Sequence, residues 1–124
     1  MNINPYNHIK TTVLELVTFI RNEVPHSEET EQDLEFIENF FFMMKNSDLA
    51  DHVKLKVLPL EEEISERNTD FFLSKENRGI FSIVPEEKYK FFTDAIKNKK
   101  VPEEAILCIF DYFDTLIELV KLIK

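Results

Sequence analysis

The chain has 124 residues but only one glycine, Gly79. Tight β-hairpin turns need positive φ angles, which glycine adopts at the lowest cost. We therefore expect few hairpins and a fold built from helices. Of the five prolines, Pro25 separates two amphipathic stretches and Pro59 interrupts a third. The others precede amphipathic stretches, as proline does in the first turn of a helix: Pro5, Pro85 and Pro102.

Apolar residues recur with the 3.6-residue period of a helix along most of the chain. Ser27 is expected to cap the second helix, because three glutamates follow it in the first turn. Ser47 or Asp48 is expected to cap the third, and Ser74–Val84 is predicted to be a loop. The predicted helices cover residues 5–23, 28 to about 44, 48 to about 57, 60 to about 72, 85 to about 98, and 102 to the C-terminus.

The last predicted helix has the most regular pattern. Its apolar residues are spaced three and four apart: Ile106, Ile109, Phe113, Leu116, Val120 and Ile123. A polar stripe accompanies them: Asp111, Asp114, Glu118 and Lys121. This pattern is typical of a bundle helix or of a short coiled-coil pair. We predict an all-α fold, a single-domain bundle of five to six helices over residues 1–124, with the last helix packed along the first two.

The formal charge of −9 disfavours direct binding to nucleic acid, because phosphate would be repelled. It leaves open an acidic regulator that binds a basic, nucleic-acid-binding partner. The single cysteine, Cys108, cannot form an internal disulfide and is expected to be a small core residue. Met1–Lys10 is polar, and no apolar run approaches the roughly 18 residues that cross a bilayer, so we expect no secretory segment, no membrane span and a cytoplasmic location.

The sequence offers no convincing catalytic, cofactor or metal site. Paired glutamates start several predicted helices, where the helix dipole favours negative charge: Glu28-Glu29, Glu61-Glu62-Glu63, Glu86-Glu87 and Glu103-Glu104. Glu23-x-x-His26 has the spacing of one di-iron ligand pair, but such sites need two copies. Asp111 and Asp114 resemble the aspartate loop of haloacid-dehalogenase-type phosphatases, but that loop has one intervening residue and follows a strand. His8, His26 and His52 are isolated from one another and from Cys108.

The ordinary pattern of a helical bundle, with one apolar side per helix, does not explain two stretches of the sequence. The candidate interface consists of Phe40, Phe41, Phe42, Met43 and Met44, which place apolar groups all around the second helix. Either this helix is central in the bundle, or part of the run docks a partner. The other stretch is Arg67–Leu73, in which Arg67 and Asp70 are spaced for a local ion pair.

The segments Ile64–Leu73 and Pro102–Leu116 resemble those of small uncharacterised helical proteins of nucleocytoplasmic large DNA viruses, which often carry Trp at the position of Phe110. The resemblance implies a viral protein made in host cytoplasm and packaged in the virion. It defines no functional residues. From the residues themselves we expect a non-enzymatic protein–protein interaction or assembly protein, which binds a protein partner or self-associates.

Overall fold

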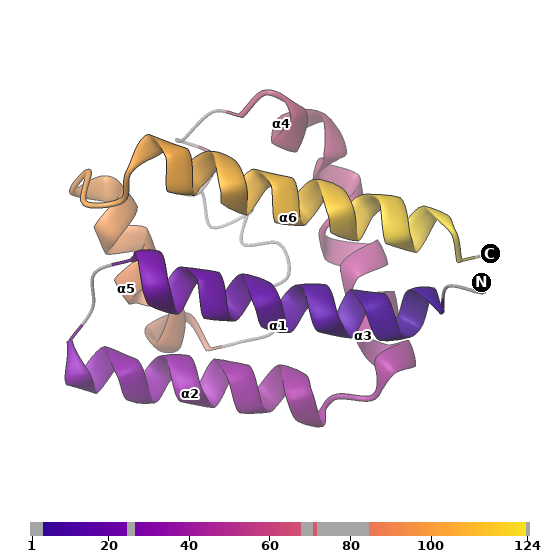
Figure 1. Ribbon diagram of the computed structural model, residues 1–124, viewed down its shortest axis with the longest axis horizontal. Coiled ribbons are helices and arrows are strands. Elements are labelled where there is room, and N and C mark those ends of the chain that lie inside the picture. Colours follow the sequence, from indigo (N-terminus) through magenta and orange to yellow (C-terminus); the bar gives the residue numbers. More distant parts are fainter. Residues whose placement is uncertain (1–3, 25–26, 68–70, 72–84, 124) are drawn as a thin grey trace.

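A computed structural model of the protein describes residues 4–24, 27–67, 71 and 85–123 (Figure 1). These residues form an all-α bundle without a strand. The elements are α1 (Pro5–Glu23), α2 (Glu28–Met43), α3 (Asn46–Lys56), the 3₁₀ helix η1 (Leu58–Leu60), α4 (Glu61–Ser65), α5 (Glu86–Lys97) and α6 (Glu103–Lys121).

The predicted starts of the first two helices are confirmed. Asn4 caps α1, with its Oδ1 accepting a hydrogen bond of 3.0 Å from the Tyr6 amide, and Pro5 occupies the first helical position. Ser27 caps α2, with its Oγ accepting from the Thr30 amide at 3.3 Å. In both helices a side chain satisfies an amide that has no partner within the helix.

Two predicted boundaries are wrong. Neither Ser47 nor Asp48 caps the third helix, which begins at Asn46 after Lys45. The expected helix of residues 60 to 72 is also shorter, because α4 ends at Ser65 and Arg67 has a left-handed φ of 56°. The predicted loop at residues 74–84 lies outside the described residues.

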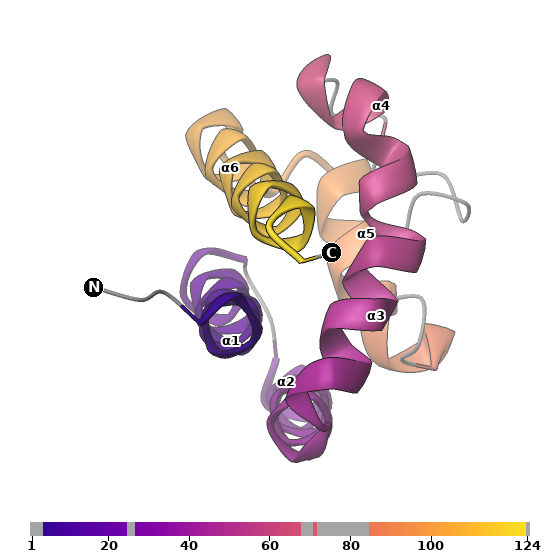
Figure 2. The ribbon, with the colours of Figure 1, turned by 90° about the vertical axis from the view of Figure 1, so that its right-hand side faces the viewer.

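Three long helices lie side by side in one layer, with α1 between α6 and α2 (Figure 1). α1 runs in the opposite direction to both of its neighbours. Seen from the end of this layer, α3, η1 and α4 form a column that crosses one face, with α5 beside it (Figure 2). α2 is therefore at one edge of the layer. The described helices α1, α3 and α5 cover one side of it and leave the other side open.

The core lies between the layer and the crossing helices. Five residues of the expected seam are buried in α6: Ile106, Ile109, Phe113, Leu116 and Val120. The sixth, Ile123, follows the end of the helix and is partly buried against the core. The buried face of α6 is wider than that seam, because the helix contacts α1, α3 and α4. α2 is not among these main neighbours, so the predicted packing of the last helix along the second is wrong. The largest fully buried side chains are Phe41, Phe92, Phe110, Ile9, Leu16, Leu34, Ile37, Leu49, Ile64, Ile109 and Leu116.

Candidate protein-interaction surface

The five residues of the predicted interface are divided between the core and the surface. Phe41 is fully buried, and Phe40 and Met44 are partly buried against the core. Phe42 and Met43 are 63% and 79% exposed. α2 thus buries Phe41 on one side and exposes Phe42 and Met43 on the other, so the described helices do not enclose it as a central helix. Docking of a partner on the exposed side stays a prediction.

The exposed side of α2 continues from Met43 toward the start of the helix. The exposed residues Glu29, Gln32, Phe36, Asn39 and Met43 follow one another at intervals of three and four. This is the spacing of a seam along which a second helix can pack. We call these five residues the α2 seam.

Phe36 was not among the predicted interface residues, although it is 42% exposed. Its ring is stacked on the Phe40 ring, with a centroid distance of 6.3 Å. The Phe40 ring in turn makes an edge-to-face contact with the ring of the buried Phe41, with a centroid distance of 5.9 Å. The exposed aromatic surface is therefore continuous with the core. Phe36, Asn39, Phe40, Met43 and Met44 line an open groove on this side of α2. The seven-residue interval between Phe36 and Met43 was the sequence signal that could have identified Phe36.

The backbone that carries Phe42 and Met43 is held by α1. Lys10 Nζ donates to the carbonyl oxygen of Phe42 at 3.0 Å and also to that of Met44. These carbonyls belong to the negative end of the helix dipole, which a cation stabilises. Next to them, Asn46 Nδ2 donates to Asn7 Oδ1 at 2.7 Å. The exposed side chains therefore project from a fixed helix end.

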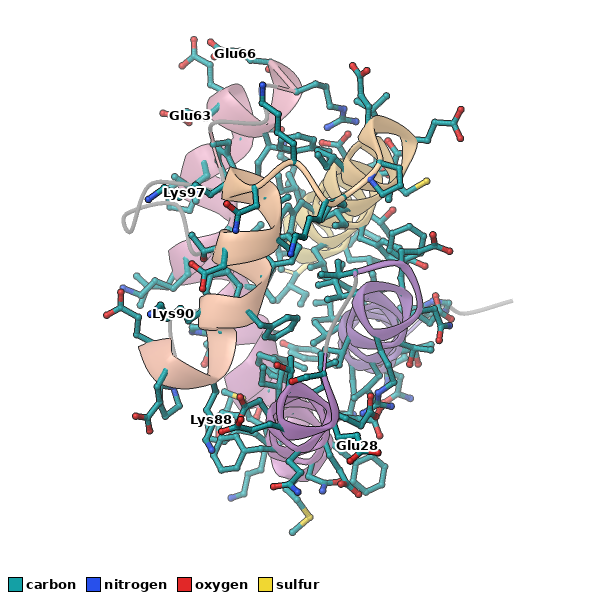
Figure 3. All side chains as sticks on the ribbon, turned by 90° about the vertical axis from the view of Figure 1, so that its left-hand side faces the viewer. Glu28, Glu63, Glu66, Lys88, Lys90 and Lys97 are labelled. Carbon is teal, nitrogen blue, oxygen red and sulfur yellow. The ribbon has the colours of Figure 1, made fainter. Side chains whose placement is uncertain are left out.

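Ion pairs hold the flanks of α2. Arg21 of α1 reaches Glu31 at 2.9 Å and Glu38 at 3.0 Å. Lys88 of α5 pairs with Asp33 at 3.2 Å and lies 5.4 Å from the centre of the Phe36 ring. Figure 3 shows Lys88 beside α2, at the end of α5 far from Lys97. Three of the six acidic residues of α2 are thus tied to neighbouring helices.

The two aspartates that resembled a phosphatase loop bind an arginine. Arg67 Nη2 lies 3.0 Å from Asp111 Oδ1 and also contacts Asp114, while Arg67 Nη1 donates to the Ile64 carbonyl at 3.1 Å. The Arg67 guanidinium lies 5.4 Å from the centre of the Phe110 ring. The predicted partner of Arg67, Asp70, lies outside the described residues. These contacts join α4 to α6, which is a structural role.

A second aromatic contact lies on the outer surface between α1 and α6. The rings of Phe19 and Tyr112 are 5.7 Å apart, and Cys108 lines the adjoining groove. Cys108 is exposed, so its expected place in the core is wrong: position 108 falls on the side of α6 that faces away from the crossing helices. Burial, the Glu15 carboxylate and Cys108 together raise the pKa of Tyr112 above its usual value of 10.0.

The described residues contain no cluster of three or more His, Cys, Asp or Glu side chains that could hold a metal ion. The glutamate pairs occupy the first turns of α2, α4, α5 and α6, as predicted. Among the histidines, His8 is exposed on α1, His52 is buried in α3, and His26 lies outside the described residues.

Comparisons with protein-family models, curated proteins and solved structures find no match to this chain. The resemblance to viral helical proteins therefore stays a prediction. None of the described helices combines the length and the apolar character that crossing a membrane requires.

Proposed function

We propose that the chain is a non-enzymatic interaction or assembly protein that acts in the cytoplasm and binds a protein partner through α2. The observation that carries this proposal is the pair of exposed neighbours Phe42 and Met43, together with the exposed Phe36 about two helical turns before them. Solvent exposure of large apolar groups costs free energy, and contiguous ones mark binding surfaces. Phe and Met are also enriched at protein interfaces.

The attachment of α2 to the bundle supports the same function. Lys10 binds the carbonyl groups at the end of the helix, and Arg21 and Lys88 bind its flanks. A partner that meets this surface does not have to order it first. Binding to a surface fixed in advance loses less conformational entropy than binding to a flexible one.

Recovery of bound protein from the cells that make the chain tests the proposal. The tagged full-length chain is compared with Met43→Glu and with a control, Leu122→Glu, which changes an apolar residue of the same class at the end of α6 that is 63% exposed. We expect Met43→Glu to lose the recovered protein and Leu122→Glu to keep it, with all three helical by circular dichroism. Recovery that is equal in all three, or absent in all three, would contradict the proposal.

A further inference from the structure

The α2 seam changes its chemistry along the helix. Its first residue is acidic, the next is polar, and Phe36 and Met43 are apolar. A parallel exposed row lies beside it, whose members are seven positions apart: Glu28, Glu35 and Phe42. One end of the exposed side of α2 is therefore acidic and the other end is apolar. α2 contains no lysine or arginine.

The acidic end also carries carboxylates that have no ion partner within the described part of the chain. Arg21 and Lys88 engage Glu31, Glu38 and Asp33 on the flanks of the helix. Among the described residues, no ion pair involves the exposed Glu28, Glu29 or Glu35. In Figure 3, Glu28 lies at the α2 end of the molecule, far from Glu63 and Glu66 of the α4 region.

The apolar end is too small to form a standard interface by itself. At roughly 200 Å² for a large side chain, the exposed fractions of Phe36, Phe42 and Met43 leave roughly 350 Å² accessible. A standard interface covers about 800 Å² per partner. A partner must therefore extend beyond these three residues, and along the seam the surface it meets next is acidic.

From this arrangement, and on the basis of the proposed function, we infer that the partner presents an amphipathic helix with an apolar first half and a Lys- or Arg-rich second half. This helix lies antiparallel to α2 along the α2 seam. Its apolar half covers Phe36 and Met43, and its basic half lies over Glu28, Glu29 and Glu35. The antiparallel direction places the basic residues at the C-terminal end of the partner helix, where the helix dipole favours positive charge.

The charges around the apolar end agree with this direction. Lys10 binds the last carbonyl groups of α2, and Lys45 follows the helix as an exposed residue. A basic segment placed there would meet like charges. A second copy of the chain is a poorer occupant, because each copy carries a net charge of −9 and an acidic seam end of its own.

The test measures binding of a synthetic helical peptide of about 20 residues, which spans about 30 Å, by fluorescence anisotropy. In its first half the peptide has leucines spaced three and four residues apart, so that they form one side of the helix, and in its second half it has lysines. A matched peptide has glutamates in place of the lysines. The proteins are the wild-type chain, Met43→Glu, Glu28→Gln/Glu29→Gln/Glu35→Gln, and the single variant Glu35→Gln. The control, Glu62→Gln/Glu63→Gln/Glu66→Gln, makes the same change of charge on exposed residues in and just after α4.

We expect the lysine peptide to bind the wild-type chain, and the glutamate peptide not to bind. Met43→Glu and the α2 triple variant should each weaken binding about tenfold, whereas the α4 control should change it less than about twofold. Glu35 lies beyond the first turn of α2, so Glu35→Gln should weaken peptide binding without destabilising the start of the helix. Raising the salt should weaken binding to the wild-type chain, because the contacts to the lysines are screened.

Equal effects of the two triple variants would show unspecific charge attraction and overturn the inference. So would an absence of peptide binding, or binding that does not depend on Met43. A dimer that depends on Met43 in sedimentation, without peptide binding, would identify a second copy as the occupant instead. In each case the proposed function stands or falls separately, on whether Met43→Glu loses the protein recovered from cells.

Discussion

Arg67 Nη2 lies 3.0 Å from Asp111 Oδ1, and this contact joins the end of α4 to the middle of α6. Lys121, the last residue of α6, pairs with Glu61, the first residue of α4, at 2.5 Å. The two ion pairs together set the direction in which α4 lies along α6. Three residues of the polar stripe of α6 therefore form ion pairs within the chain: Asp111, Asp114 and Lys121. Its aspartates need no substrate to account for them.

Replacing Arg67 should destabilise the bundle by a modest amount. Asp111 is 72% exposed, so its ion pair is worth little, and the contact with the Phe110 ring adds about 0.5–1 kcal/mol. We expect Arg67→Ala to lower the free energy of unfolding by about 1–2 kcal/mol in urea titrations. Arg67→Gly should lose about 1 kcal/mol less, because glycine adopts the φ of 56° without strain. An unchanged Arg67→Ala variant would show that these contacts do not stabilise the fold.

Adjacent residues of α2 should respond very differently to truncation. Phe41 is fully buried, so Phe41→Ala should cost about 3–5 kcal/mol of unfolding free energy through lost burial and a cavity. Phe42→Ala should change it by less than about 0.5 kcal/mol, because the side chain is mostly in solvent. Both values come from chemical denaturation of the purified chain. Similar costs for the two variants would mean that the division of this run between core and surface is wrong.

Lys10→Met should loosen the end of α2. The substitution keeps much of the side-chain length but removes the cation from the carbonyl groups of Phe42 and Met44. We expect a loss of about 1 kcal/mol and faster hydrogen exchange in the last turn of α2. Lys54→Met, at an exposed position of α3, is the control and should leave both quantities unchanged. Equal exchange in the two variants would argue against a role for Lys10 in fixing this end.

Tyr112 should give the bundle a dependence on alkaline pH. Burial, Glu15 and Cys108 raise the pKa of Tyr112 in the folded state, whereas in the unfolded chain it is near 10.0. The folded state thus holds the phenol proton more tightly, and its contribution to stability is complete below pH 10 and is lost as pH rises through the folded pKa. Thermal unfolding between about pH 9 and pH 11.5 should show a steeper fall for the wild-type chain than for Tyr112→Phe. Parallel curves would contradict the raised pKa.

The sequence predicted those elements whose signals are local. The bounds of α1 and the start of α2 depend on Asn4, Pro5 and Ser27, which act within one helical turn. The buried seam of α6 follows from its periodicity, which does not depend on which helix covers it. Because periodicity does not identify the neighbouring helix, it could not predict that the main neighbours of α6 besides α1 are α3 and α4, and not α2.

Features that depend on distant residues could not be predicted in this way. α4 ends early where Arg67 turns toward Asp111 and Asp114, a contact that no local pattern encodes. Cys108 lies among apolar residues in sequence but on the outer side of α6. For the candidate surface, composition pointed to the run that contains Phe42 and Met43. Phe36 was missed, because it lies outside this run, although it precedes Met43 by seven residues and shares its side of α2.

Photo-crosslinking from position 43 of the full-length chain tests the central claim most directly. A photoreactive amino acid replaces Met43 in one protein and Leu122 in another, and both are irradiated in the cells that make the chain. The account predicts discrete protein adducts from position 43 and none from position 122, which is exposed but lies outside the α2 seam. An unreactive position 43, or the same adducts from both positions, would contradict an interaction surface on α2.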